Sequence, residues 1–456
     1  MGYSLLAKEG YDMLGFTWTA TIWGLALFAL RRVPWLHIKL DREHFAIILL
    51  LLSTHSLSRT SAEEILSDPV TFERALRGVL VAIALLIVVP VILKRLRGGA
   101  QPGGKAIVAL MIYVAVAAAS FFYSAAPIVS LAKTFELAVV LAVAIAFTMR
   151  GDAKDALRSA LQLVVVLEGA LIAVAVLGYF TMPSAFHLVG GRPGFLAGPT
   201  LKSPYAHFNH LSASSGMLFA YALSSVLSVR IRSARVGWIS VSVVATAGML
   251  LSAGRQGLVI FLASAAVVLF FQRRRLFLIG IVPLSALVVV ANWDLLFGLA
   301  QRGQSASNFS SLSGRLEWWS VAADVWRVHP WTGYGFGTGG RFVALREVGS
   351  NASSLHNGYI EALTGVGIIG FLPLLYAIVR ATSWSLTSLR RGVMSSEAIL
   401  IVPLLLHTAV SLGFGAWMVA DVLLFMFLAA LSDVDSRRTL MPTAPLLTAG
   451  VVENGS

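Results

Sequence analysis

Three short segments carry residues whose types and spacing fit a defined chemistry. Arg255 lies in a short turn of small residues, Arg315 precedes a Trp-rich segment, and His356 stands at the start of a late apolar stretch. A guanidinium group binds two oxygens of a phosphate at once and stays charged, whereas an imidazole exchanges protons near neutral pH. Together these residues predict a site that holds an anionic ligand and moves a proton.

Each of these residues also has a structural interpretation. Arg255 is so close to two apolar stretches that it needs either an anionic partner or lipid headgroups within its reach. A single histidine at the start of a helix, such as His356, is commonly structural. The co-occurrence of His356 with two arginines favours the ligand-binding hypothesis.

Positive charge also gathers in residues 182–209, which contain Arg192, Lys202 and His207 but no carboxylate. We expect Arg192 and Lys202 to support anion binding. A second long connection, residues 292–356, admits a plainer alternative, a solvated surface on which arginines and acids balance. The residues of that surface are Arg302, Arg315, Arg327, Arg341 and Arg346 with Asp294, Glu317, Asp324 and Glu347.

The composition limits the elements that can position such a site. Of 456 residues, 57% are hydrophobic and only 12% are Asp, Glu, Lys or Arg, which excludes a water-soluble fold. The fold class is therefore all-α, a polytopic integral membrane protein. We expect no nucleic-acid partner, because the formal charge of +13 is explained by basic loops on one side of a lipid bilayer.

Apolar runs predict about 12 transmembrane helices, or 13 if the last run is a hairpin broken at Gly413 and Gly415. The first run meets two arginines without a cleavage site, so we expect it to be retained. The runs are residues 16–30, 45–57, 79–93, 107–122, 135–149, 161–179, 211–229, 236–251, 258–271, 276–291, 359–379 and 398–431.

These runs define one membrane domain, residues 1–431, with two long periplasmic loops at 182–209 and 292–356 and a polar cytoplasmic tail at 432–456. Most of the 35 Lys and Arg residues fall in alternate short connections, which identifies that side as cytoplasmic. The side of the N-terminus stays open between the two span counts.

The segment between Ser313 and Pro330 predicts an amphipathic helix in the second long loop. Ser313 is the expected N-cap and Glu317 favours the first turn. Apolar residues recur at helical spacing, and the segment ends at Pro330. We expect this helix to lie in the plane of the membrane interface with its apolar face in lipid, either beside a ligand or as a simple anchor. The predicted face comprises Leu316, Trp319, Ala323 and Trp326, widened by Trp318 and Val325.

Other chemistries find no support in the sequence. There is no cysteine and no motif of a metal-dependent or serine hydrolase, so we expect no cofactor and no metal. A glycine-rich stretch from Gly333 to Gly340 predicts a tight turn. Four titratable residues in apolar runs fit either a proton path in a transporter or structural pairing, which we favour: Glu136, Glu168, His407 and Asp421.

Several motifs follow one another in the second half of the chain. They are Ser252-Ala-Gly-Arg255, Ser313-Gly-Arg315-Leu-Glu-Trp-Trp, His329-Pro-Trp-Thr-Gly333-Tyr-Gly335-Phe-Gly, His356-Asn357-Gly-Tyr359 and Gly365-Val-Gly367; the first half adds Ser124-Ala-Ala-Pro127-Ile-Val-Ser130-Leu-Ala-Lys133. Their order resembles the O-antigen ligase and polysaccharide polymerase superfamily of bacterial inner-membrane proteins.

The resemblance implies a glycan donor carried on undecaprenyl diphosphate, a glycan or lipid A core as acceptor, and a site facing the periplasm. Arg255, Arg315 and His356 match the arginines and histidine that the family requires, whereas Arg192 corresponds only by position. The spacing between Arg315 and His356 is short for the family and leaves the acceptor open. A flippase or a chain-length regulator is a further partner that such an activity implies.

The expected reaction follows from this resemblance and from the residue types. Arg255 and Arg315, with Arg192 or Lys202, would hold the departing diphosphate, and His356 would take the proton of the acceptor hydroxyl. One displacement inverts the anomeric carbon and needs no metal. Supporting residues are Asn357, Tyr359, Glu317 and His207. We favour a polymerase of O-antigen or exopolysaccharide repeat units; the alternatives are a ligase that uses lipid A core and a transporter or flippase of lipid-linked sugars.

Overall fold

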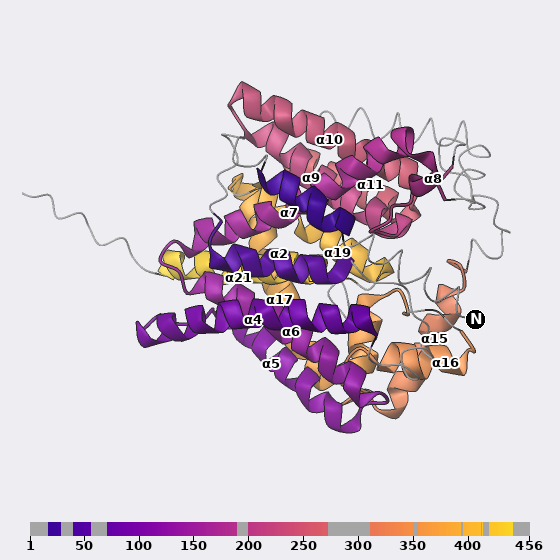
Figure 1. The fold of residues 1–456 in the computed structure, drawn as a ribbon. Helices are drawn as coiled ribbons and strands as arrows, with labels where there is room; N and C mark the ends of the chain where they lie inside the picture. The colour runs from indigo at the N-terminus through magenta and orange to yellow at the C-terminus, as the bar shows by residue number, and fades with distance from the viewer. Residues whose placement is uncertain are drawn as a thin grey trace, which may run out of the picture.

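The computed structural model of the chain is built from helices. It describes residues 17–28, 40–55, 71–188, 199–271, 311–350, 352, 354–393, 395–411, 413 and 419–440. Residues 17–28 are helical, and the remaining helices in chain order are α2 (Arg42–His55), α4 (Phe72–Arg97), α5 (Lys105–Ala119), η1 (Ser120–Tyr123), α6 (Pro127–Thr148), α7 (Ala153–Thr181), α8 (Pro183–Phe186), α9 (Phe208–Ser228), α10 (Arg232–Ser252), α11 (Arg255–Phe271), α15 (Arg315–Val328), η2 (Gly339–Ala344), α16 (Leu345–Glu347), α17 (Gly358–Arg391), α18 (Ser395–Ala398), α19 (Ile401–Val410) and α21 (Val419–Leu440) (Figure 1).

Seven helices of the described residues are long and apolar enough to cross a membrane: α4, α5 with η1, α6, α7, α9, α10 and α17. Helix α11 and the α18–α19 pair are shorter apolar helices. The predicted class, a polytopic helical membrane protein, is therefore confirmed. The predicted count of about 12 spans is not shown, and the predicted run at 276–291 lies outside the described residues.

The last predicted run divides into two helices. Helix α19 ends at Val410 and α21 begins at Val419, on either side of the expected break at Gly413. Helix α21 continues to Leu440, beyond the predicted end of the membrane domain at residue 431.

Large apolar side chains cover the outside of the helices. Leu86 on α4, Phe122 on η1 and Phe180 on α7 are among the most exposed hydrophobic residues. A soluble protein does not tolerate such a surface, whereas lipid tails solvate it. Helix α9 differs because its Ser and Ala residues are mostly buried, which allows close approach of α10 and α11.

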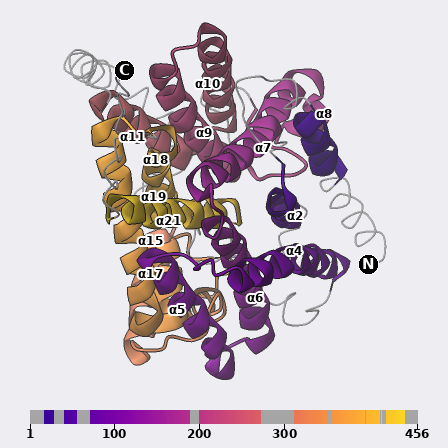
Figure 2. The same ribbon diagram turned by 90° about the vertical axis from the view of Figure 1, so that its left-hand side faces the viewer.

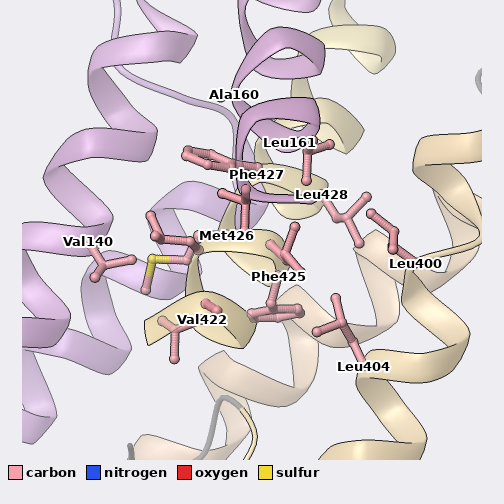
Figure 3. Close-up of a cluster of buried hydrophobic side chains, with 14 of the residues drawn as sticks. Val140, Ala160, Leu161, Leu400, Leu404, Val422, Phe425, Met426, Phe427 and Leu428 are labelled. Atoms are coloured by element: carbon pink, nitrogen blue, oxygen red, sulfur yellow. The ribbon is translucent and has the colours of Figure 1, made fainter. Parts of the chain in front are cut away.

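Helix α21 forms the centre of the bundle. Every residue from 420 to 431 is buried, and the side chains meet α6, α7 and α19, for example Val140, Leu161 and Leu404 (Figure 3). A helix that is buried on all sides is apolar all round, as this one is between Asp421 and Asp433. In Figure 2, α21 crosses the middle of the molecule.

Basic connections gather at one end of the bundle, which we call the basic end. Arg95 pairs with Glu43, and Arg150 Nη1 lies 2.6 Å from Asp41 Oδ2. Lys154 Nζ lies 2.7 Å from Asp435 Oδ1, and Arg158 Nε lies 3.1 Å from Glu397 Oε1. These contacts agree with the prediction that the short basic connections lie on the same side of the bundle.

The opposite end, which we call the site end, holds the connections with the candidate residues. Helices α15 and α16 lie side by side at the lower right of Figure 1, and α8 lies at the upper right. The α10–α11 turn and the start of α17 belong to this end, because α10 begins and α17 ends at a basic connection. Ser313, just before α15, contacts Arg255 and so belongs to it too.

Asp433 fastens α21 to α5 at the basic end. Its carboxylate is buried and accepts hydrogen bonds from the backbone N–H groups of Gly104, Ala106 and Ile107, at 2.9, 3.1 and 3.0 Å. These are donors that the first turn of α5 cannot satisfy itself, and a negative charge there also favours the helix dipole.

We predict that Asp433→Ala destabilises the protein by roughly 2 to 4 kcal/mol, because three buried N–H groups lose their acceptor. Thermal unfolding of the purified protein measures this loss as a lower midpoint, and Asp433→Asn, which keeps one acceptor oxygen, lowers it less. The matched control is Asp324→Ala, since Asp324 is exposed and pairs with Arg327. Equal midpoints for Asp433→Ala and wild type would contradict the assigned role.

Candidate functional site

Arg255 is fixed by the tight turn between α10 and α11. The turn packs on Ser212 of α9, whose hydroxyl donates to the Gly254 carbonyl at 2.9 Å. A Cβ atom on Gly257 would lie 1.9 Å from the Ser212 hydroxyl oxygen, so only glycine permits this approach. Arg255 is the first residue of α11 and is partly buried, as the shortness of the turn predicts.

Arg315 begins α15 and turns towards the end of α19. Its Nη1 donates to the carbonyl of Val410 at 3.0 Å. The carbonyls at a helix C-terminus carry partial negative charge, so they attract a cation. This contact brings α15 to the α19 end of the bundle and holds the guanidinium partly buried at the site end.

Ser313 has a different role from the predicted one. The N-cap of α15 is Gly314, with φ of 84°, and it makes no side-chain capping bond. The Ser313 hydroxyl instead accepts a hydrogen bond from Arg255 Nη2 at 3.3 Å. The N-cap prediction was wrong because the chain before α15 is left-handed, which turns the hydroxyl away from the helix and towards α11.

The two arginines share one environment. Burial lowers the pKa of Arg315, and the positive charge of Arg255 lowers it further. Two positive charges that influence each other in this way lie close together. The structure thus places Arg255 and Arg315 near one another.

His356 lies at the start of α17 beside α15. Its ring stacks on Trp318 with 6.2 Å between the ring centroids and 25° between the planes. The next residue, Asn357, caps α17 by accepting hydrogen bonds from the N–H groups of Tyr359 and Ile360, each at 3.1 Å. Trp318 is three residues after Arg315, so α15 links the histidine to the two arginines.

Left-handed backbone occurs at His356 and close to Arg255 and Arg315. In the described chain, the non-glycine residues with positive φ are Ala253, Leu312, Ser313 and His356. Each is one of the three candidates or lies within three residues of one. This conformation costs an L-residue about 1 kcal/mol or more, and such strain clusters at functional sites.

The glycine-rich segment is a tight turn, as predicted, and it packs on a break in α17. Gly367 has φ of 61°, and a Cβ atom there would lie 2.2 Å from the carbonyl oxygen of Trp331. The N–H groups of Tyr334 and Gly335 donate to the carbonyls of Thr364 and Gly365 at 2.9 and 2.8 Å. The turn therefore pairs with α17 backbone to backbone and sets the position of its first two turns.

The motif in the first half of the chain holds the other side of this turn. The Ser130 hydroxyl donates to the Phe336 carbonyl at 2.8 Å, and the hydroxyls of Ser124 and Thr338 lie 3.0 Å apart. A Cβ atom on Gly335 would lie 2.3 Å from the Ser124 hydroxyl. The motif joins α6 to the site end.

The buried face of α15 agrees with the predicted one at Trp318, Trp319 and Val325 and differs from it elsewhere. Ala322 and Val325 are buried against Leu345 and Leu355, and the Trp319 indole donates to the Leu355 carbonyl at 2.8 Å. Leu316, predicted to be on the apolar face, is exposed. The correction has a simple cause: α15 packs on η2, α16 and the start of α17, which the sequence cannot reveal.

The residues predicted to support the site have different positions in the structure. His207 caps α9 by accepting from the Asn209 N–H group at 3.2 Å, and the Tyr359 hydroxyl donates to the Leu405 carbonyl at 3.2 Å. Glu317 is exposed, and Lys202 is partly buried with its N–H bonded to the Phe186 carbonyl. Arg192 lies outside the described residues.

Two residues near the site were missed as functional candidates. Arg341, assigned to a solvated surface, is buried, whereas Arg327 with Asp324 fits that description. Glu361 is also buried, and its Oε1 accepts from the N–H of Leu355, next to His356, at 2.7 Å. In the sequence, the sign of this contact is that Glu361 follows His356 by only five residues.

The titratable residues in the apolar runs are paired. Glu136 contacts Arg77 and Lys133, and Asp421 Oδ2 lies 2.7 Å from His407 Nδ1. Glu168 Oε2 lies 3.7 Å from His210 Nε2. The favoured interpretation, structural pairing, agrees with these contacts. Within the described ranges, no three His, Asp or Glu side chains form a metal-binding group.

Comparison with known proteins identifies a domain in the second half of the chain. No curated protein matches the chain. Residues 240–375 match the model of the family Wzy_C, O-antigen ligase, and this stretch includes Arg255, Arg315 and His356. The chain therefore contains, at residues 240–375, a Wzy_C domain of the superfamily of O-antigen ligases and polymerases.

Proposed function

We propose that the protein is a glycosyltransferase that moves a glycan from undecaprenyl diphosphate to an acceptor hydroxyl. The observation that carries the proposal is the shared environment of Arg255 and Arg315, inside the Wzy_C domain and on the helix whose Trp318 stacks on His356. In this proposal the protein is a multi-pass protein of the bacterial inner membrane, and its site end faces the periplasm.

The two arginines bind the diphosphate of the donor. Arg255 approaches from the α10–α11 turn and Arg315 from the start of α15, so their guanidinium groups reach the diphosphate from two sides. A guanidinium bonds two phosphate oxygens at once, which lysine does not do. Positive charge fixed in a partly buried place stabilises the charge that develops on the leaving group.

His356 accepts the proton of the acceptor hydroxyl. As that proton moves to the imidazole, the hydroxyl oxygen attacks the anomeric carbon, and the bond from this carbon to the diphosphate breaks. The leaving diphosphate keeps the electron pair and stays on the arginines. One displacement inverts the anomeric configuration, and the arginines supply the positive charge, so the step uses no metal.

The site supports two acceptors with the same chemistry. We favour a polymerase that joins lipid-linked repeat units, because the segment from Ser313 to Asn357 looks more like the polymerases of the superfamily. A ligase with lipid A core as acceptor is the alternative. A transporter, in contrast, would form no new glycosidic bond from the same donor.

We predict that Arg315→Lys lowers glycan transfer at least about 100-fold, because the charge remains but the two-oxygen contact is lost. The measurement is product formation by the protein in lipid nanodiscs with a donor linked to undecaprenyl diphosphate. The matched control is Arg327→Lys on the exposed face of α15, which should keep wild-type activity. Near-normal transfer by Arg315→Lys would refute the assigned role.

We predict that His356→Ala abolishes transfer, by about 100- to 10,000-fold, while donor binding stays within about twofold. Binding of the labelled donor and product formation are measured on the same sample. His329→Ala is the matched control, since His329 is exposed and lies against Tyr334. Equal losses of binding and product would show a structural histidine instead.

A further inference from the structure

The base of the proposed reaction stands in a strained part of the backbone. His356 has φ of 53°, the left-handed conformation that an L-residue avoids. It is the second residue before α17, because Asn357 is the N-cap of that helix. Such a conformation persists only where the surrounding structure holds the backbone in it. The groups that hold the neighbours of His356 therefore decide where its imidazole lies.

The first turn of α17 fixes the chain after His356. The Asn357 side chain accepts hydrogen bonds from the N–H groups of Tyr359 and Ile360, each at 3.1 Å. The Asn357 carbonyl accepts from the N–H of Glu361 at 2.9 Å. These are the ordinary bonds of a capped helix, and they do not involve the residues before His356.

Leu355 fixes the chain before His356, because side chains bind both of its backbone groups. Its N–H donates to Glu361 Oε1 at 2.7 Å, and its carbonyl accepts from the Trp319 indole at 2.8 Å. Leu355 is 0% exposed and Glu361 is 3% exposed, so little water competes for the bond between them. The peptide on the N-terminal side of His356 is thus clamped from α17 and from α15.

The carboxyl group of Glu361 is itself held against η2. A Cβ atom on Gly340 would lie 2.3 Å from Glu361 Oε2 and 2.8 Å from Leu355 Cδ1, so only glycine permits both side chains to pack there. Burial lowers the pKa of Arg341 to about 10, and the charge of Glu361 opposes this shift, which places the two opposite charges near each other. The first turn of α17 also favours a negative group through the helix dipole.

A plain helix cap is the alternative role for Glu361, and its position differs from that of a cap. In a capping box, the acidic residue is third in the helix and binds the N–H of the N-cap residue. Glu361 is the fourth residue of α17, and its bond passes both Asn357 and His356 to reach Leu355. The bond therefore closes a loop that contains His356.

We propose that Glu361 is a positioning residue, which holds His356 where it takes the proton of the acceptor hydroxyl. Trp319 has the same role at the other backbone group of Leu355. This inference rests on the proposed function and adds to it the residues that orient the base. A general base must lie within hydrogen-bond reach of the proton, and a displacement of about 1 Å costs about 100-fold in rate.

Glu361→Ala tests the role, because it leaves the Leu355 N–H without its acceptor. In lipid nanodiscs with a donor linked to undecaprenyl diphosphate, kcat should fall about 100-fold. The Kd of labelled donor, measured on the same sample, should stay within about twofold, since the arginines are untouched. Glu361→Gln keeps an oxygen for the Leu355 N–H and should restore kcat to within about fivefold of wild type.

Trp319→Phe tests the second bond and also serves if Glu361→Ala does not fold. It keeps an aromatic ring but offers no N–H to the Leu355 carbonyl, so kcat should fall about tenfold with donor binding unchanged. The matched control is Glu397→Ala, since Glu397 is a buried carboxyl group at the basic end that pairs with Arg158. Its kcat per folded molecule should equal that of wild type.

A double substitution separates action through His356 from a general effect on the fold. Residual transfer by His356→Ala is measured with and without Glu361→Ala. The second substitution should change the residual rate by less than about twofold, because no imidazole is left to position. A Glu361 that only stabilised the fold would lower the residual rate by the same factor as in wild type.

Other results would also overturn the inference, and they are distinguishable from failure of the proposed function. Donor binding that falls as much as kcat in Glu361→Ala would show a wider disturbance of the site. Wild-type kcat in both Glu361→Ala and Trp319→Phe would show that the clamp on Leu355 does not position the base, and would leave the proposed function intact. No transfer by wild type itself would overturn both.

Discussion

The site end depends on one constraint: guanidinium groups are held where little water reaches them. A guanidinium group tolerates partial burial only if carbonyls, carboxylates or a ligand face it. Arg315 meets the Val410 carbonyl at the end of α19, and Arg255 meets the Ser313 hydroxyl. Both of these contacts are with neutral oxygen atoms, and the positive charge of Arg255 also lowers the pKa of Arg315. The proposed function supplies an anion, the donor diphosphate, at this place.

Backbone conformation, more than helix packing, brings these groups together. The left-handed residues before Arg315 turn Ser313 towards Arg255, and the left-handed His356 turns its ring onto Trp318. The break at Gly367 then lets the glycine-rich turn bond to α17 and fixes the height of His356 in the bundle. Packing around these few residues offsets their strain, for example the contact of Trp319 on α15 with Leu355 just before His356.

The sequence predicted the class of fold and singled out the candidate site residues, because both have local signals. Apolar length marks a spanning helix, and Arg255, Arg315 and His356 stand in short distinctive motifs. What it missed depends on contacts between distant segments. Arg341 looked like a surface charge because nothing local shows that η2 buries it against α17. Ser313 looked like an N-cap because a serine stands just before the helix. The sequence does not show that the backbone from Leu312 to Gly314 is left-handed.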